Sequence, residues 1–311
     1  MPSINLTIII PHKNTPNLLQ RCLNSIPYLD DIQIVIVDDN SDPAIVDFTQ
    51  FPGIGRPGTE VYFTKEGKGA GYARNFGLEH ANGRWLIFAD ADDFFTENAF
   101  DCLLAMTDSP HEIIYFRVTS CYSDTYELAY RDECIAINKR IDNYINNIQN
   151  AENWLRYRFL VPWGKMIKTD LIERKLIKFE KVMTGNDVMF SLLTGYFAHS
   201  INAVDCTIYC VTVNKGSLSF TSNIEILMTR YLVLLRYNEF LKEHNKSYYK
   251  TYAPTYYILS SLKYGLGVFF KCIRLAIHHK TNPFVGIFQW SRFIIFYKAK
   301  KKNVSYIIDQ L

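Results

Sequence analysis

The chain has 311 residues, of which 48% are hydrophobic and 21% are charged, with 15 Gly and 11 Pro. This composition supports an ordinary hydrophobic core and excludes a disordered chain or a fibrous repeat protein. The net charge is +3, but residues 230–311 carry 14 Lys and Arg against 3 Asp and Glu, whereas residues 1–229 carry 20 against 28. An acidic N-terminal part and a basic, aromatic C-terminal part predict different surroundings for the two ends, and they do not resemble a nucleic-acid-binding domain.

The cysteines and the apolar runs indicate the cellular compartment that the sequence favours. Seven cysteines are scattered without a CxxC pair or a histidine at zinc-ligand spacing. Their odd number, and a start without the basic region of a signal peptide, favour a reducing cytoplasm. Cys206 and Cys210 share one face of an expected strand, which favours packing over a redox role. No uncharged apolar run approaches the ~20 residues of a membrane-spanning helix.

Expected strands and helices alternate in the first part of the chain. Helical spacing predicts helices over residues 16–26, 70–81 and 96–106, the last capped by Thr96. Apolar, β-branched runs predict strands at residues 6–10, 32–37, 61–63, 85–88 and 113–117. This alternation is typical of βαβ units and a mostly parallel sheet. Beyond them we expect helices at residues 151–160 and 187–197, a strand at 206–213, and helices from residue 224 onward.

Acidic residues follow two of these strands directly. Asp38 and Asp39 follow the second strand, and Asp90, Asp92 and Asp93 follow the fourth. Ligands of open α/β sheets bind outside the carboxyl ends of the strands, so both clusters should converge on one crevice. Carboxylate oxygens suit Mg²⁺ or Mn²⁺, which also bind substrate phosphates. The alternative is that these residues are solvated turn residues or helix caps.

A glycine-rich stretch at residues 67–78 lies between the two acidic clusters. Its glycines allow close approach of the backbone, and Arg74 brings a guanidinium that suits a diphosphate. The stretch does not match the GxxxxGK[ST] pattern of a P-loop. A GxGxxG pattern at residues 53–58 precedes a strand rather than a helix, which predicts a turn and argues against a Rossmann dehydrogenase.

The segments LTIIIPHKN, IVIVDDNSDP, GAGYARNFGLEHANGRWLIFADADD, VPWGKMIK and KFEKVMTGNDVMF occur in order over residues 5–215. They resemble the family 2 glycosyltransferases of GT-A fold. The resemblance implies an α/β fold with a Rossmann-like, mostly parallel nucleotide-binding sheet flanked by helices. It also implies inverting transfer of a sugar from a nucleotide donor, usually a UDP-sugar, with Mg²⁺ or Mn²⁺ as cofactor.

The resemblance assigns nucleotide-binding roles to five residues. Pro11 and His12 would line the base pocket, with His12 where the family often has Tyr. Asp39 would accept the uracil imide N–H, and Asp38 would shape that loop. Arg74 would touch the nucleotide or its diphosphate.

The same resemblance assigns roles to residues around the metal and the acceptor. Asp90 would face the ribose and the metal, Asp92 would bind the metal, and Asp93 would support the site. Trp163 and Lys165, in the segment VPWGKMIK, would border the acceptor side.

The general base is implied at Asp187, with one departure from the family. The family commonly has Glu-Asp at this point, whereas this chain has Asn186 and Asp187. A neighbouring carboxylate raises the pKa of a base, and Asn186 removes that effect while offering a hydrogen bond. The alternative is that Asp187 is only a carboxylate favoured by the helix dipole.

These inferences predict a GT-A catalytic domain over residues 1–215 and a helical, basic, aromatic extension over residues 216–311. We expect an inverting glycosyltransferase that acts on a hydroxyl of a glycan or lipid-linked acceptor in bacterial surface polysaccharide synthesis. A nucleotidyltransferase and an inactive nucleotide-sugar-binding scaffold stay as alternatives. Residues 269–274 and 284–302 mix aromatics with cations, which predicts peripheral contact with an anionic membrane from the cytoplasmic side.

Overall fold

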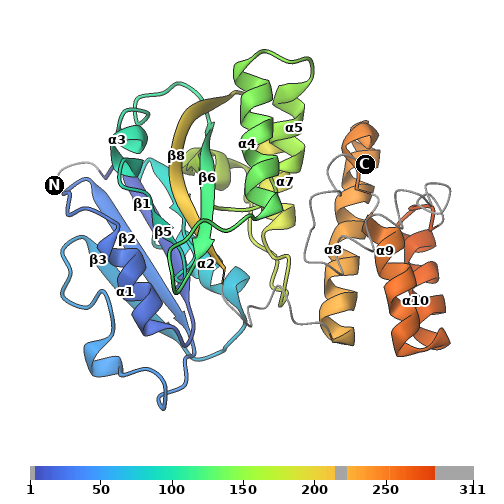
Figure 1. The fold of residues 1–311 in the computed structure, drawn as a ribbon, viewed down its shortest axis with the longest axis horizontal. Helices are drawn as coiled ribbons and strands as arrows, with labels where there is room; N and C mark the ends of the chain where they lie inside the picture. The colour runs from blue at the N-terminus through green and yellow to red at the C-terminus, as the bar shows by residue number, and fades with distance from the viewer. Residues whose placement is uncertain (1–3, 214–222, 252, 284–311) are drawn as a thin grey trace. The chain divides into compact units, whose positions relative to one another are not determined.

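A computed structural model describes residues 4–213, 223–251 and 253–283 of the chain (Figure 1). The chain divides into two compact units, residues 1–215 and 216–311. Each unit has its own hydrophobic core, and each is described below by itself.

The first unit is built on one mixed sheet. Among the described residues this sheet has eight strands in the order β3-β2-β1-β4-β7-β6-β8-β5. Strands β1, β2, β3, β4, β6 and β8 run in one direction, β7 runs against both of its neighbours, and β5 runs against β8. The six parallel strands therefore end at one edge, which we call the carboxyl edge. The strand bounds are β1 Leu6–His12, β2 Ile32–Asp39, β3 Thr59–Thr64, β4 Trp85–Phe88, β5 Phe94–Phe95, β6 Ile113–Tyr122, β7 Lys165–Lys168 and β8 Ile201–Val213.

Helices cover the sheet, which explains why its central strands are continuous apolar runs. Every residue of β1, β2 and β4 is buried. Helix α2 packs on β1 and β2, and α4 packs on β6 and β8, with α5 and α7 alongside α4 (Figure 1). The helix bounds are α1 Pro16–Asn24, α2 Ala70–Leu78, α3 Ala99–Leu104, α4 Asp132–Ile145, α5 Ala151–Arg158, α6 Thr169–Lys175 and α7 Val188–Phe197.

The predicted order of elements is confirmed, with local differences. All five predicted strands exist, residues 206–213 form the second half of the longer β8, and residues 53–58 form turns. The prediction that Thr96 caps a helix is wrong, because α3 begins at Ala99 with Asn98 as its N-cap. Thr96 instead bonds to β8: its N–H donates to the Ile208 carbonyl at 3.1 Å, and its hydroxyl donates to the Thr207 carbonyl at 2.6 Å.

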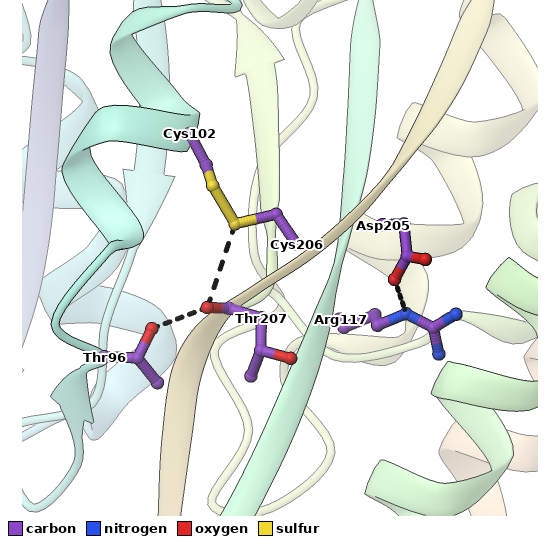
Figure 2. Close-up of a disulfide and its surroundings, with 6 residues drawn as sticks. All are labelled: Thr96, Cys102, Arg117, Asp205, Cys206 and Thr207. Carbon is purple, nitrogen blue, oxygen red and sulfur yellow. Dashed lines mark hydrogen bonds and ion pairs between the residues drawn. A yellow bond between two sulfur atoms is a disulfide. The ribbon is translucent and has the colours of Figure 1, made fainter.

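A disulfide between Cys102 of α3 and Cys206 of β8 corrects the expectation that Cys206 only packs (Figure 2). The two cysteines are 104 positions apart in the chain, so no local spacing motif relates them. Cys210, by contrast, is a buried free thiol. The disulfide joins α3 to β8 close to the register shift between β6 and β8 at Arg117, whose guanidinium pairs with Asp205.

The second unit is helical. It contains α8 Ile224–Glu243, α9 Ala253–Ser260 and α10 Leu266–His278, with two short 3-10 turns, Ser247–Tyr249 and Ser261–Tyr264. The Tyr231 hydroxyl donates to the Cys272 carbonyl at 2.8 Å and so ties α8 to α10. The buried core comprises Tyr231, Leu235, Ile258, Cys272 and Ala276. No helix in the described part of the chain is long and apolar enough to cross a membrane. The predicted contact residues 284–302 lie outside the described residues.

Candidate functional site

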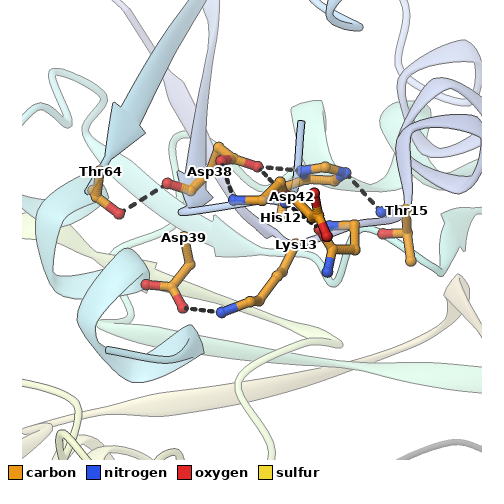
Figure 3. Close-up of polar contacts among 9 residues, drawn as sticks. His12, Lys13, Thr15, Asp38, Asp39, Asp42 and Thr64 are labelled. Carbon is orange, nitrogen blue, oxygen red and sulfur yellow. Dashed lines mark hydrogen bonds and ion pairs between the residues drawn. The ribbon is translucent and has the colours of Figure 1, made fainter. Parts of the chain in front are cut away.

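The ends of β1 and β2 are joined by His12 and Asp38 (Figure 3). The His12 Nε2 accepts from the Thr15 N–H at 3.1 Å, so we assign the ring proton to Nδ1, which donates to Asp38 at 2.7 Å. Burial alone would raise the pKa of Asp38, but hydrogen bonds from His12 and Ser41 hold that pKa below its ordinary value. Pro11 is buried beside His12 in β1. Asp38 therefore bonds to Ser41 in the loop after β2.

Asp39, the last residue of β2, is buried but not fully satisfied. Its Oδ2 accepts from the Gly69 N–H at 2.8 Å and lies 3.6 Å from the Lys13 Nζ. Its Oδ1 is buried and has no hydrogen-bond partner among the described residues. A buried acceptor without a donor is costly, so this oxygen is suited to an N–H group supplied by a ligand.

Arg74 of α2 joins the two acidic parts of the site. The side chain is 5% exposed. One of its terminal nitrogens pairs with the Asp90 carboxylate, and the other donates to the Asn186 Oδ1 at 2.7 Å. Asp187 follows Asn186 directly and is the N-cap residue of α7. Arg74 thereby brings the end of β4 and the start of α7 to one place.

The three aspartates after β4 have different environments. Asp93 is buried, its Oδ1 accepts from the Thr212 N–H at 2.7 Å, and burial followed by the charges of Asp92 and Asp90 raises its pKa well above the ordinary value. The Asp92 carbonyl accepts from the Thr212 hydroxyl at 2.6 Å and from Arg21. Asp93 therefore anchors the segment to β8, and Asp90 and Asp92 are left to meet a ligand.

The carboxylates of Asp90 and Asp92 fit a divalent cation. Burial and the charge of Asp90 raise the pKa of Asp92, which shows that negative charge is crowded here. In the described ranges no three His, Cys, Asp or Glu side chains gather as a complete metal site. Mg²⁺ commonly uses one or two carboxylates and completes its shell with water and substrate phosphate. The pair therefore fits a cation that is shared with a phosphate-bearing ligand.

Asp187 retains partial exposure, which a base that meets an external hydroxyl needs. Burial raises the pKa of Asp187, the neighbouring charge of Arg74 lowers it, and the net direction is upward. A carboxylate with a raised pKa is a stronger base at neutral pH than an ordinary surface aspartate. The geometry is thus compatible with proton removal at this position.

Trp163 and Lys165 differ from the expectation that they border the acceptor. Trp163 is buried, with its ring stacked 5.7 Å from that of Tyr209. Lys165 is fully buried, and its Nζ donates to the Phe159 carbonyl at 3.0 Å. Burial lowers the pKa of Lys165 to about 7, against the opposing effect of the Asp187 charge. Neither side chain offers an open surface, so we regard both as supports beneath the site.

Three site residues were missed by the sequence interpretation. Arg21 and Thr212 both hold the Asp92 carbonyl, and the Tyr209 hydroxyl accepts from the Asp90 N–H at 2.8 Å. Arg21 follows no motif within α1, and the two β8 residues are more than 110 positions away from the aspartates. Pairing of β8 with β6 brings them to the site, and that pairing was not predicted.

Comparison with known sequences identifies the family. The sequence pattern of Glycosyl transferase family 2 matches residues 7–174, more than half of the chain. The chain belongs to this family. It is 23% identical to the glycosyltransferase GlyA of Streptococcus pneumoniae serotype 4 over 227 residues, which cover 69% of this chain and 31% of GlyA. It therefore spans about a third of that relative's length.

Two Bacillus subtilis proteins are also similar. The chain is 22% identical over 275 residues to EpsH, which is named as a glycosyltransferase. The match covers 84% of this chain and 75% of EpsH. It is 30% identical over 108 residues to GgaB, a minor teichoic acid biosynthesis protein, covering 33% of this chain and 12% of GgaB.

Solved structures confirm the predicted GT-A fold. Staphylococcus aureus TarS residues 1–349, in complex with UDP-GlcNAc, superpose with a TM-score of 0.64 at 16% identity, covering 86% of this chain and 79% of TarS. The mannosyltransferase PcManGT of Pyrobaculum calidifontis, in complex with GDP-Man and Mn²⁺, gives a TM-score of 0.56 at 16% identity, covering 97% of this chain and 84% of PcManGT. At these identities the likeness establishes the fold alone.

We predict that Lys165→Met changes the pH dependence of stability. The folded protein releases the Lys165 proton above about pH 7, whereas the unfolded chain keeps it up to about 10.5. Between these values the unfolded state binds more protons, so rising pH stabilises the wild type relative to the variant by up to about 1.4 kcal/mol per pH unit. Urea unfolding between pH 6 and 9 measures the difference.

The control for this measurement is Lys168→Met, which removes a more exposed ammonium from the same strand and should follow the wild type. Equal pH slopes for Lys165→Met and the wild type would contradict the assignment of a buried, readily deprotonated lysine.

Proposed function

We propose that the chain is an inverting, metal-dependent glycosyltransferase that moves a sugar from a UDP-sugar to a hydroxyl of a glycan or lipid-linked acceptor. The observation that carries this proposal is the bridge made by Arg74. It brings Asp90 of the Asp-x-Asp segment beside Asn186, and hence beside Asp187. A group that binds a diphosphate and a group that removes a proton thus meet at one site.

The free oxygen of Asp39 supports UDP over GDP as the donor nucleotide. Uracil presents one imide N–H, which needs one acceptor oxygen. Guanine presents two adjacent N–H donors, which suit both oxygens of one carboxylate. In Asp39 the Gly69 N–H already occupies Oδ2, so one oxygen is left. TarS, with its UDP-GlcNAc complex, fits this choice of donor.

The chemistry follows from the positions of the charged groups. Asp187 takes the proton of the acceptor hydroxyl, whose oxygen forms a bond to the anomeric carbon as the bond from that carbon to the diphosphate oxygen breaks. Attack from the face opposite the leaving group inverts the configuration. Asp90 and Asp92 would hold the cation, which when bound supplies positive charge to the departing diphosphate. Arg74 keeps Asp90 in place for that contact.

The substrate class rests on the similar proteins. GgaB, which is similar to part of this chain, is named for minor teichoic acid biosynthesis. We therefore place this chain in bacterial surface polysaccharide synthesis. A lipid-linked acceptor would bring the enzyme to the cytoplasmic face of the membrane.

We predict that UDP raises the melting temperature of the protein only when Mn²⁺ or Mg²⁺ is present, and that GDP does so less. A ligand at 100 times its Kd adds about 2.7 kcal/mol of stability. Asp92→Ala should abolish this metal-dependent UDP shift while the protein stays folded, because this half-buried carboxylate contributes little packing. Thermal unfolding with each nucleotide, with and without EDTA, measures this effect. An undiminished UDP shift in EDTA would remove the metal from the mechanism.

We predict that Asp187→Asn lowers kcat by about 10²–10⁴ and hardly changes UDP binding, because the amide keeps the shape but not the basicity. Release of UDP from a panel of UDP-sugars and acceptors measures kcat. Asp170→Asn, on α6, is a control for the loss of one carboxylate. Sugar transfer at near the wild-type rate by Asp187→Asn would show that another residue is the base. Release of pyrophosphate from UTP and a sugar phosphate would indicate a nucleotidyltransferase instead.

The α10 helix supports the proposed membrane contact. Leu266, Phe270 and Ile277 lie at helical spacing and are 67%, 56% and 63% exposed. Lys271 and Arg274 are exposed on the same helix. Exposed apolar side chains flanked by cations suit the headgroup layer of an anionic bilayer, where each nearby cation adds about 1 kcal/mol.

We predict that the full chain sediments with anionic liposomes at low salt and less so at high salt. The double substitution Leu266→Ser and Phe270→Ser should abolish this binding, because it removes the inserted side chains. Leu176→Ser, which alters a leucine 82% exposed in the first unit, is the matched control. Equal sedimentation of all three proteins would exclude α10 as the contact.

A further inference from the structure

The order of the strands divides the carboxyl edge into two sides. The candidate base-binding residues lie at the carboxyl ends of β1 and β2, and Asp90 and Asp92 follow β4. The sheet then continues through β7, β6 and β8. The ends of β6 and β8 therefore lie beyond the metal-binding carboxylates, on the side away from the nucleotide base.

The turn after β6 is adjacent to those carboxylates. Cys121 of β6 pairs with Thr212 of β8, and Thr212 bonds to both Asp92 and Asp93. Tyr122 is the next residue along β6. The turn that begins there carries exposed aromatic rings, with Tyr126 58% exposed. An exposed aromatic surface thus begins beside the Asp-x-Asp segment.

Arg21 connects this turn to the segment directly. One of its terminal nitrogens donates to the Ser123 carbonyl at 3.1 Å and to the Ser123 hydroxyl at 3.0 Å, and the other donates to the Asp92 carbonyl. Its guanidinium carbon lies 5.4 Å from the centre of the Phe94 ring and 5.7 Å from that of Tyr126. The two ring centres are 6.1 Å apart. Tyr126 is therefore fixed against groups that also hold Asp92.

The backbone of Tyr126 is unusual for a bulky residue. Its φ is +58°, in the left-handed region that glycine and asparagine favour. The turn is closed by two backbone hydrogen bonds of 2.9 Å, from the Tyr126 N–H to the Tyr122 carbonyl and from the Tyr122 N–H to the Glu127 carbonyl. Strain of this kind persists where the surroundings enforce it, and it concentrates at ligand sites.

We propose that Tyr126, held by Arg21 and Phe94, forms a subsite for a pyranose ring of the acceptor. This inference rests on the proposed function. A pyranose has apolar C–H faces that pack on an aromatic ring, and a tyrosine adds a hydroxyl for the polar rim of the sugar. The donor sugar would be held through its diphosphate, by the cation at Asp90 and Asp92. The acceptor carries no such charged group and therefore needs a binding surface of its own. Tyr126 is exposed, and its partner Arg21 also holds the Asp92 carbonyl, so a sugar ring on Tyr126 would lie near the Asp-x-Asp segment.

The test uses variants that keep the backbone of the turn. Tyr126→Asn removes the ring and suits the left-handed conformation, and Tyr126→Phe keeps the ring. Tyr126→Gly suits the same backbone and replaces the asparagine variant if that variant loses cooperative unfolding. The control is Tyr28→Asn. Tyr28 is 68% exposed and stacks 4.0 Å from the Arg56 guanidinium, but it precedes β2 and so lies at the opposite edge of the sheet.

The probes are lactose, cellobiose, maltose and chitobiose, each titrated in saturation-transfer NMR with UDP and Mn²⁺ present. At least one disaccharide should bind the wild type through its ring C–H groups. Tyr126→Asn should weaken that binding about fivefold or more, as expected for loss of an aromatic contact. Tyr126→Phe, which loses only the hydroxyl, should weaken binding less than Tyr126→Asn does, and Tyr28→Asn should bind like the wild type.

Binding of UDP with Mn²⁺ is measured by calorimetry on the same samples, which separates the two proposals. If UDP does not bind the wild type, the proposed function fails. If UDP binds but Tyr126→Asn binds the disaccharides as the wild type does, or if the wild type binds none of them, the acceptor subsite at Tyr126 is overturned.

Discussion

Arg74 carries a positive charge into a group of carboxylates that would otherwise repel one another. It pairs with Asp90 and lowers the pKa of Asp187, against the burial that raises it. Without this charge, burial and the charge of Asp90 would favour protonation of Asp187 more strongly. The candidate metal-binding carboxylates and the candidate base can therefore occupy one site because the buried guanidinium of Arg74 lies between them.

The glycines of α2 make this position of Arg74 possible. A Cβ on Gly71 would lie 2.2 Å from the Glu180 carbonyl oxygen and 2.9 Å from the Asn186 Cβ, so no larger residue fits there. Gly69, with a φ of +88°, turns its N–H toward Asp39. The glycine-rich stretch thus allows close packing of neighbouring loops against α2. This agrees with the expectation that its glycines allow close approach of the backbone.

The parts of the fold that could be predicted are those with a local physical signal. Long apolar runs identify strands buried on both faces, and the aspartates at their ends identify the carboxyl edge. Strand β7 has only four residues, with a lysine at each end, and β5 has two residues. Neither is long enough to show the hydrophobic pattern by which a strand is predicted. The pairing of Cys102 with Cys206, like the contact of Thr212 with Asp92, depends on where β8 enters the sheet. Such contacts are non-local and leave no spacing pattern.

The burial of Lys165 is a second case in which local sequence was insufficient. The motif predicted a residue at the acceptor side, but a motif does not distinguish a side chain that faces a ligand from one that lies beneath the surface. Lys165 contacts the Phe159 carbonyl and lies 4.7 Å from the centre of the Phe159 ring. This apolar setting explains its lowered pKa, and the charge of Asp187 is what opposes the loss of its proton.

Because Asn186 is uncharged, it does not counteract the lowering of the Asp187 pKa by Arg74. A glutamate here would pair with Arg74 through charge, and it would place a second carboxylate beside Asp187, which raises the pKa of a base. The Asn186 Oδ1 accepts the same hydrogen bond at 2.7 Å without adding charge. The field of Arg74 at Asp187 is then offset by Asp90 but not by the adjacent residue. The pKa of Asp187 in this chain is therefore raised by burial and lowered mainly by Arg74, with a smaller contribution from Lys165 while that lysine is protonated. The departure from Glu at position 186 is compatible with Asp187 as an ionised base.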